Sequence, residues 1–308
     1  MTTSSDGTVE IREVGPRDGL QNEATLPVEQ RVALIDALSG TGLQAIEAAS
    51  FVHPLAIPPM AGSSEVMAQI DRAPGVRYRV LVPNERGAHD ALAAGADEIE
   101  VVMSISETHN IKNIKMMPDE SVEQIIGLAA LARAASKPVE AILSTAFGCV
   151  FEGDVDPDRV AMYAKRVLDE AGVDTLSFGD TSGMATPRVV NELLDSLDAV
   201  GIAPDTVAMH FHNTRNTGLA NILLCLQRGV RRFDASIGGL GGCPYSPGAT
   251  GNVPTEDVVH MVNDLGYDTG IDLEALIAAG HFAEELIGRE LPSQVLRAGP
   301  RTRTVAAD

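Results

Sequence analysis

Short apolar runs alternate with longer amphipathic segments along the chain. The short runs have strand length, are rich in Val, Ile or Leu, and are bounded by Gly, Pro or polar residues. They cover residues 9–14, 43–50, 78–83, 98–104, 139–145, 175–180, 207–213 and 232–239. The segments between them repeat apolar side chains at helical spacing or show helix start and stop residues. The clearest of these are residues 28–40, 157–172, 187–201 and 216–229. The pattern therefore predicts strands that alternate with helices.

A faint internal repeat marks four of the points where a predicted strand begins. In each copy a helix ends on a glycine and an apolar strand follows at once, at Gly42, Gly95, Gly172 and Gly229. Glycine suits this position because the residue after a helix commonly adopts a left-handed conformation. About eight strand–helix units indicate parallel strands with crossover helices, and 308 residues accommodate them as a (β/α)8 TIM barrel.

We expect one domain over residues 1–308, with its core from about 9 to 290, extra helices after Thr255 and a polar tail over 298–308. A doubly wound open sheet is the alternative fold. That fold normally carries a glycine-rich phosphate fingerprint after its first strand, and GPRDGLQ at residues 15–21 is not one.

Composition narrows the class of protein. The formal net charge of −20 argues against binding to nucleic acid and against an anionic membrane surface. Three cysteines in a chain of this length do not form a disulfide framework, which indicates a reducing compartment. The N-terminus lacks the regions of a signal peptide, and no apolar run has the length of a membrane span. We therefore expect a cytoplasmic globular protein.

Polar residues at the ends of the predicted strands are the candidates for chemistry, because TIM-barrel active sites lie at the C-terminal ends of the strands. For each lone carboxylate, a solvated loop or a helix cap is an equally weighted alternative. The selected residues are Arg17, Asp18, Glu47, Asp180, His210, His212, Cys243 and Asn252.

The sequence HFH at residues 210–212 is the most informative of these. Residues i and i+2 of a strand share a face, so both imidazoles would point toward the barrel axis. A hydrogen-bonded pair of core histidines is the alternative, but two histidines in register favour a metal site. Asp18 and Asn252 offer oxygen ligands, and such a mixed set suits Mg²⁺ or Mn²⁺ better than a structural zinc.

The third candidate feature is a glycine-rich segment, GGLGGCPYSPGATGN, that carries Cys243 and follows the last predicted strand. A cysteine in such a loop, over a cationic site, can act as a proton donor or a nucleophile. The alternative is a small residue in a tight turn. Cys149 and Cys225 look structural instead.

Several motifs together resemble those of the 3-hydroxy-3-methylglutaryl-CoA lyase family. They are EVGPRDGLQNE, IEAASFV, FGDTSG, HFHNT and GGLGGCPYSPGATGNVPTEDVV, and the resemblance runs from about Val9 to Ile287. It implies a (β/α)8 barrel that uses Mg²⁺ or Mn²⁺ and binds an acyl-CoA. The reaction implied is retro-Claisen cleavage to acetyl-CoA and acetoacetate, a step of leucine catabolism, in a protein that tends to form a homodimer.

The resemblance also implies roles for individual residues. Arg17 would stabilise the enolate that forms on the thioester, and Cys243 would protonate it. Glu47 and Asp180 would be active-site carboxylates, and Glu256 would support the glycine-rich loop. The metal ligands would be Asp18, His210, His212 and Asn252.

The chain departs from the family pattern where the substrate is expected. Ala24 stands where the family usually has Lys, Glu140 where it has Arg, and Ile142 where it has Tyr. We expect Arg17, Gln21, Glu140 and Ile142 to contact the substrate, and Glu140 to repel a substrate carboxylate if it faces the mouth. A 3-hydroxyacyl-CoA with a different C3 substituent is therefore an alternative substrate.

Other enzyme classes fit less well. A Claisen condensing enzyme of the isopropylmalate or citramalate synthase kind usually reads RDGEQ where this chain reads RDGLQ. A non-catalytic barrel would have lost a metal or proton-transfer residue, and each is present. A zinc amidohydrolase would place HxH after the first strand rather than the seventh.

Overall fold

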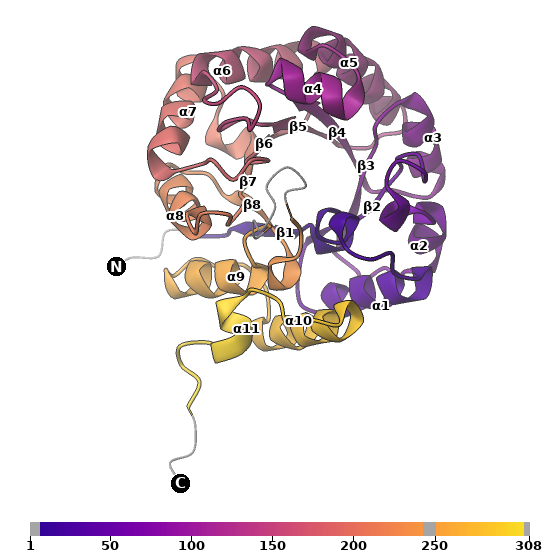
Figure 1. Ribbon diagram of the computed structural model, residues 1–308, viewed down its shortest axis with the longest axis vertical. Helices are drawn as coiled ribbons and strands as arrows, with labels where there is room; N and C mark the ends of the chain where they lie inside the picture. Colours follow the sequence, from indigo (N-terminus) through magenta and orange to yellow (C-terminus); the bar gives the residue numbers. More distant parts are fainter. Residues whose placement is uncertain (1–6, 243–250, 305–308) are drawn as a thin grey trace.

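The computed structural model describes residues 7–242 and 251–304 and shows a closed barrel of parallel strands in chain order (Figure 1). Each strand pairs with the next one in the sequence, and the eighth closes the barrel against the first. The predicted (β/α)8 fold is confirmed, and the open-sheet alternative is wrong. The strands are β1 (Glu10–Glu13), β2 (Ala45–Ser50), β3 (Arg77–Leu81), β4 (Glu98–Ser104), β5 (Val139–Ser144), β6 (Thr175–Gly179), β7 (Val207–His210) and β8 (Arg232–Ala235).

Helices surround the barrel as an outer ring (Figure 1). The two helices that follow α9, α10 and α11, lie outside that ring, where α10 packs on α1 and α9. Extra helices were predicted after Thr255. The helices are α1 (Val28–Ser39), α2 (Ser63–Gln69), α3 (Glu85–Ala93), α4 (Glu107–Ile114), α5 (Pro118–Ala134), α6 (Pro157–Arg166), α7 (Pro187–Ala199), α8 (Gly218–Gln227), α9 (Thr255–Asp264), α10 (Leu273–Ile287) and α11 (Gln294–Ala298).

The glycine repeat has the conformation that the sequence predicts. All four glycines before strands have positive φ: Gly42 at 91°, Gly95 at 78°, Gly172 at 62° and Gly229 at 92°. At Gly42 a Cβ would also lie 2.3 Å from the carbonyl oxygen of Gly270, so a side chain is excluded twice. At each of these glycines the chain turns from the preceding helix into the following strand.

Strands β1 and β7, which lead into candidate site residues, end earlier than their apolar patterns suggest. Strand β1 stops at Glu13 and a helical turn over Gly15–Gly19 follows, so the Arg-Asp pair lies on a turn rather than on the strand. Strand β7 stops at His210, and His212 continues the line through an isolated antiparallel bridge to Asn252.

Charged side chains fill the interior of the barrel. Arg12, Arg79, Glu100, Glu140 and Asp234 come from five different strands, and each is buried. Arg12 pairs with Glu140 and Asp234, and Arg79 pairs with Glu140 and Glu100. The apolar core therefore lies between the strands and the helices, and the charged interior forms the floor beneath the C-terminal mouth.

The buried core extends past residue 290, the approximate limit predicted from the sequence, because Val295 and Leu296 on α11 are buried. Across residues 7–242 and 251–304, no helix combines the length and apolar character that a membrane span requires.

Candidate metal and active site at the barrel mouth

Three predicted ligands meet at the C-terminal end of the barrel. The turn after β1 carries Asp18, the last residue of β7 is His210, and His212 follows it. One ligand atom of each lies within 4.8 Å of the others, and the two imidazole rings are 5.3 Å apart. Phe211 points the other way and packs on Phe147, with ring centroids 5.4 Å apart. The alternation inferred from the sequence HFH therefore holds although the regular strand has ended.

Asn252 joins this group from the far end of the glycine-rich segment. Its Nδ2 donates to Asp18 Oδ2 at 2.8 Å and to the Leu240 carbonyl at 3.0 Å. Its Oδ1 and the Nδ1 of His212 are buried and have no hydrogen-bond partner among the described residues. Buried polar atoms without partners are costly, so these two atoms fit ligation of a cation.

The electrostatics suit cation binding. Burial by itself raises the pKa of Asp18, but Arg17 and the two histidines bring that pKa below its ordinary value. Burial, helped by His210, lowers the pKa of His212 to about 4. The carboxylate is therefore ionised and His212 is neutral near pH 7, which are the forms that ligate metals.

Arg17 is held beside the ligands by two carboxylates. Its Nη1 donates to Asp18 Oδ1 at 2.8 Å, and its Nε donates to Glu47 on β2. Gln21 Nε2 donates to the same Asp18 oxygen at 2.8 Å. Arg17 is 8% exposed, so its charge is fixed in place rather than free in solvent. The structure brings these four predicted residues together.

Asp180 lies beside the cluster but is engaged by the backbone. Its Oδ1 accepts hydrogen bonds from the amides of Met184 and Ala185 at 2.7 and 2.9 Å. Burial raises its pKa to about 7. Its own amide donates to the His210 carbonyl at 2.8 Å. Asp180 thus shapes the turn after β6, and a direct role in catalysis stays a prediction.

Two buried glutamates hold the loop that leads into the glycine-rich segment. Both carboxylate oxygens of Glu256 accept from the Gly238 amide, at 3.0 and 2.9 Å. Glu13 accepts from the Ile237 amide at 2.8 Å and from Thr255 Oγ1 at 2.6 Å. Burial raises the pKa of Glu256 to about 8 and that of Glu13 to about 7. Glu13 was missed as a site residue, although it opens the motif EVGPRDG.

The two predicted substrate residues of β5 lie at different depths. Glu140 has no exposed surface and pairs with Arg12 and Arg79, so it does not line the mouth and the expected contact with substrate is wrong. A side chain enclosed by two guanidinium groups cannot present its charge to a ligand. Ile142, two residues further along the strand, is partly exposed and pairs in register with Val102 of β4. Ile142 therefore remains a candidate for substrate contact.

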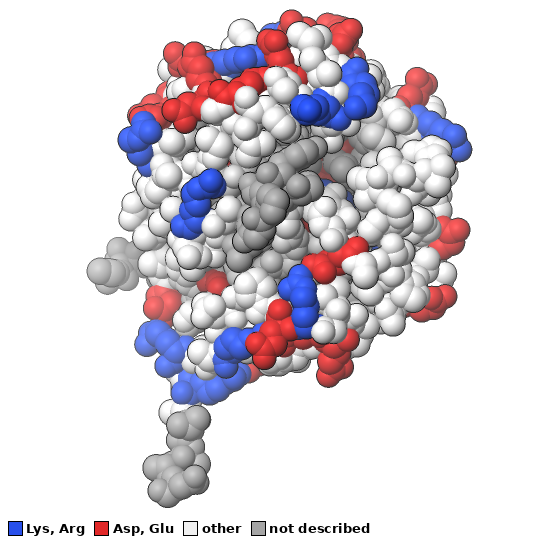
Figure 2. All heavy atoms as spheres, in the orientation of Figure 1, with Lys and Arg blue, Asp and Glu red and all other residues white. Residues whose placement is uncertain are grey.

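Cys243 lies outside the described residues, so its predicted role as an acid stays a prediction. The two remaining cysteines, Cys149 and Cys225, are buried and free. Figure 2 shows the face of the molecule that carries the mouth. It is hollowed near its centre, and most charged side chains on it gather toward the periphery.

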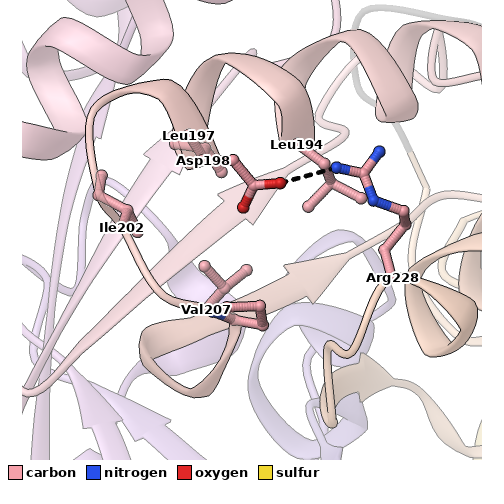
Figure 3. A pocket seen from close by; sticks show the side chains of 7 residues that line it. Leu194, Leu197, Asp198, Ile202, Val207 and Arg228 are labelled. Carbon is pink, nitrogen blue, oxygen red and sulfur yellow. Dashed lines mark hydrogen bonds and ion pairs between the residues drawn. The ribbon is translucent and has the colours of Figure 1, made fainter.

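A second recess lies far from these residues, between α7 and the start of β7 (Figure 3). An ion pair of 2.8 Å between Arg228 and Asp198 closes one side of it. Its volume of about 10 Å³ holds no more than one water molecule. It is a packing defect of the outer layer rather than a ligand site. The apolar side chains around it are Leu194, Leu197, Ile202, Pro204 and Val207.

Comparison with known proteins shows which family this chain resembles over most of its length. The family model described as HMGL-like matches residues 8–282. The hydroxymethylglutaryl-CoA lyase of Bacillus subtilis is 46% identical over 290 residues, which are 94% of this chain and 96% of that protein. The mitochondrial hydroxymethylglutaryl-CoA lyase of Mus musculus is 44% identical over 303 residues, with 97% and 93% covered.

Solved structures give the same result. The crystal structure of the Bacillus subtilis HMG-CoA lyase superposes with a TM-score of 0.93 at 45% identity and covers 95% of this chain and 98% of that one. An HMG-CoA lyase from Acinetobacter baumannii, in complex with coenzyme A and 3-methylmalate, has a TM-score of 0.94 at 38% identity, with both chains fully covered.

Proposed function

The chain belongs to the HMGL-like family, and on that premise we propose that it cleaves 3-hydroxy-3-methylglutaryl-CoA to acetyl-CoA and acetoacetate. The observation that carries the proposal is the convergence of Asp18, His210 and His212 at the mouth of the barrel, beside a fixed Arg17. The coenzyme A in the Acinetobacter baumannii structure supports an acyl-CoA substrate.

The residues present fit Mg²⁺ or Mn²⁺ as cofactor. Asp18, His210, His212 and Asn252 would hold the cation, and two of them carry a buried polar atom without a partner among the described residues. When bound, the cation polarises substrate oxygens and fixes their orientation.

The reaction breaks the bond between C2 and C3 of the acyl group. The 3-hydroxyl gives up its proton to a base at the site and its oxygen becomes the ketone of acetoacetate, while the bonding pair remains on C2 as a thioester enolate. The proton released here balances the one that C2 takes up afterwards. Arg17, locked by Glu47 and Asp18, supplies a positive charge for the enolate oxygen without any reorganisation. C2 then takes up a proton, and Cys243 is the residue that we propose as its donor.

The substrate itself is tested with a panel of 3-hydroxyacyl-CoA esters, with acetyl-CoA or propionyl-CoA release as the measurement. The departure at Ile142, a partly exposed residue of β5, favours a related ester as the second candidate. Release of free CoA from acetyl-CoA and a 2-oxo acid would instead identify a condensing enzyme. A homodimer and a cytoplasmic location stay predictions.

The Cys243→Ala variant separates chemistry from binding. We expect it to lose turnover and to retain affinity for the metal, because Cys243 is not among the proposed ligands. Lyase activity equal to that of the unaltered protein would contradict the proposed proton transfer. Cys225→Ala is the matched control, since Cys225 lies in α8 with its thiol buried.

A further inference from the structure

We propose that Asp234 is a positioning residue that fixes His210 in the orientation and tautomer required for metal binding. The inference rests on the metal site proposed above. Asp234 and His210 are register partners on the adjacent strands β8 and β7. The residue was not selected from the sequence, because it lies inside an apolar run before the strand ends.

The two nitrogens of His210 face different partners. Nδ1 lies 3.2 Å from Asp234 Oδ2, and Nε2 lies 4.0 Å from Asp18 Oδ2. A carboxylate can only accept, so Nδ1 carries the proton in this contact. In the neutral ring, Nε2 then presents its lone pair toward Asp18 and the other proposed ligands. A carboxylate that accepts a hydrogen bond from the other ring nitrogen of a ligating histidine orients the imidazole in this way.

Asp234 is itself held rigidly by Arg12. Nε and Nη2 of Arg12 approach Asp234 Oδ1 at 2.7 and 2.6 Å. One carboxylate oxygen therefore serves Arg12 and the other serves His210. Arg12 pairs in turn with Glu140, and the side chains of Asp234, Arg12 and Glu140 are all buried. Glu140 and Arg12 are thus connected to the proposed metal ligand His210 through the carboxylate of Asp234.

The alternative is that Asp234 only neutralises Arg12. Glu140 already pairs with Arg12, so charge compensation does not require a second carboxylate at the position next to His210.

Asp234→Asn tests the proposal with little change of shape. Arg12 can only donate hydrogen bonds, so the introduced amide group directs its oxygen toward Arg12. Its NH2 group then faces His210. That contact places the ring proton on Nε2, where it blocks ligation. We expect Mn²⁺ binding to the substrate-free protein, followed by the electron paramagnetic resonance signal of free Mn²⁺, to weaken about 10- to 100-fold.

Two controls make the result specific. Glu140→Gln removes a carboxylate from the same arginine without touching His210, and we expect affinity close to that of the unaltered protein. In a His210→Ala background, Asp234→Asn should have no further effect. Equal Mn²⁺ affinity of Asp234→Asn and the unaltered protein would overturn the role proposed for Asp234 but not the metal site. Absence of Mn²⁺ binding by the unaltered protein would overturn the metal site and the inference together.

A measurement on the unaltered protein does not depend on how the variants fold. Long-range ¹H–¹⁵N correlation spectra of the metal-free protein at alkaline pH report histidine tautomers. We expect the Nδ1–H form for His210, identified by the loss of its signals in His210→Gln. The Nε2–H form would contradict the proposed contact with Asp234.

Discussion

Glu140 gives the sharpest test of the charged barrel interior. Its carboxylate pairs with Arg12 and with Arg79, the latter at 2.7 Å, and it has no exposed surface. Glu140→Gln keeps the shape but removes the charge, so each guanidinium loses an ionic partner. Arg12 keeps Asp234 and Arg79 keeps Glu100, which limits the damage.

The size of the effect follows from these contacts. Loss of a hydrogen bond to a charged group costs about 1.5–3 kcal/mol, and breaking a buried ion pair costs about 3–5 kcal/mol. Because glutamine retains one acceptor and each arginine retains a carboxylate, we expect the free energy of unfolding to fall by about 2–3 kcal/mol. The melting temperature should fall by roughly 3–5 °C for a chain of this length.

Thermal or urea unfolding measures this loss, with Glu285→Gln as the control. Glu285 is an exposed residue of α10, and its substitution should change stability by less than about 0.5 kcal/mol. If Glu140→Gln proves as stable as the unaltered protein, the desolvation of these charges offsets their attraction and the reasoning is refuted.

Two further predictions concern a turn and a buried carboxyl group. Gly42→Ala should destabilise the fold by more than the roughly 1–3 kcal/mol of a left-handed residue, because its Cβ also meets Gly270. Gly266→Ala, with φ of 92° and no atom within 4 Å of the added Cβ, should show only the conformational cost, and equal losses would contradict the clash. Glu256 has a pKa of about 8 in the fold, above its ordinary 4.5, so the folded state binds more protons than the unfolded state between these values. Its contribution to stability is complete below about pH 4.5 and is lost as the pH rises through about 8, so melting temperatures should fall over this window and Glu256→Gln should flatten the slope.

Periodicity was sufficient to predict the barrel. Strands β2, β4, β6 and β8 each follow one of the repeat glycines, at 42, 95, 172 and 229, and these glycines adopt the left-handed conformation that the repeat requires. Periodicity placed the strand ends less well, because tertiary contacts decide where a ladder stops. The turn over Gly15–Gly19 is fixed by hydrogen bonds to the Val14 carbonyl, which no local pattern reveals.

The candidate site was only partly predictable. Asp18, His210 and His212 were found because they follow strand ends, but the residues that hold them were not. Asp234 and Arg12 lie within strands, and the selection of polar residues at strand ends did not include them. The usable signal was present, since charged residues alternate with apolar ones in EIRE and RYRVL and so share the inward face. The sequence alone does not say which charged residues on different strands form ion pairs.

Dependence of cleavage on the metal tests the central claim most directly. The protein is stripped with a chelator, supplied with 3-hydroxy-3-methylglutaryl-CoA, and assayed for acetyl-CoA and acetoacetate with and without added Mg²⁺ or Mn²⁺. We predict that the two products appear in equal amounts when the metal is restored, and that Asp18→Ala abolishes their formation. Cleavage that continues in the stripped protein, or no cleavage with either metal, would contradict the account.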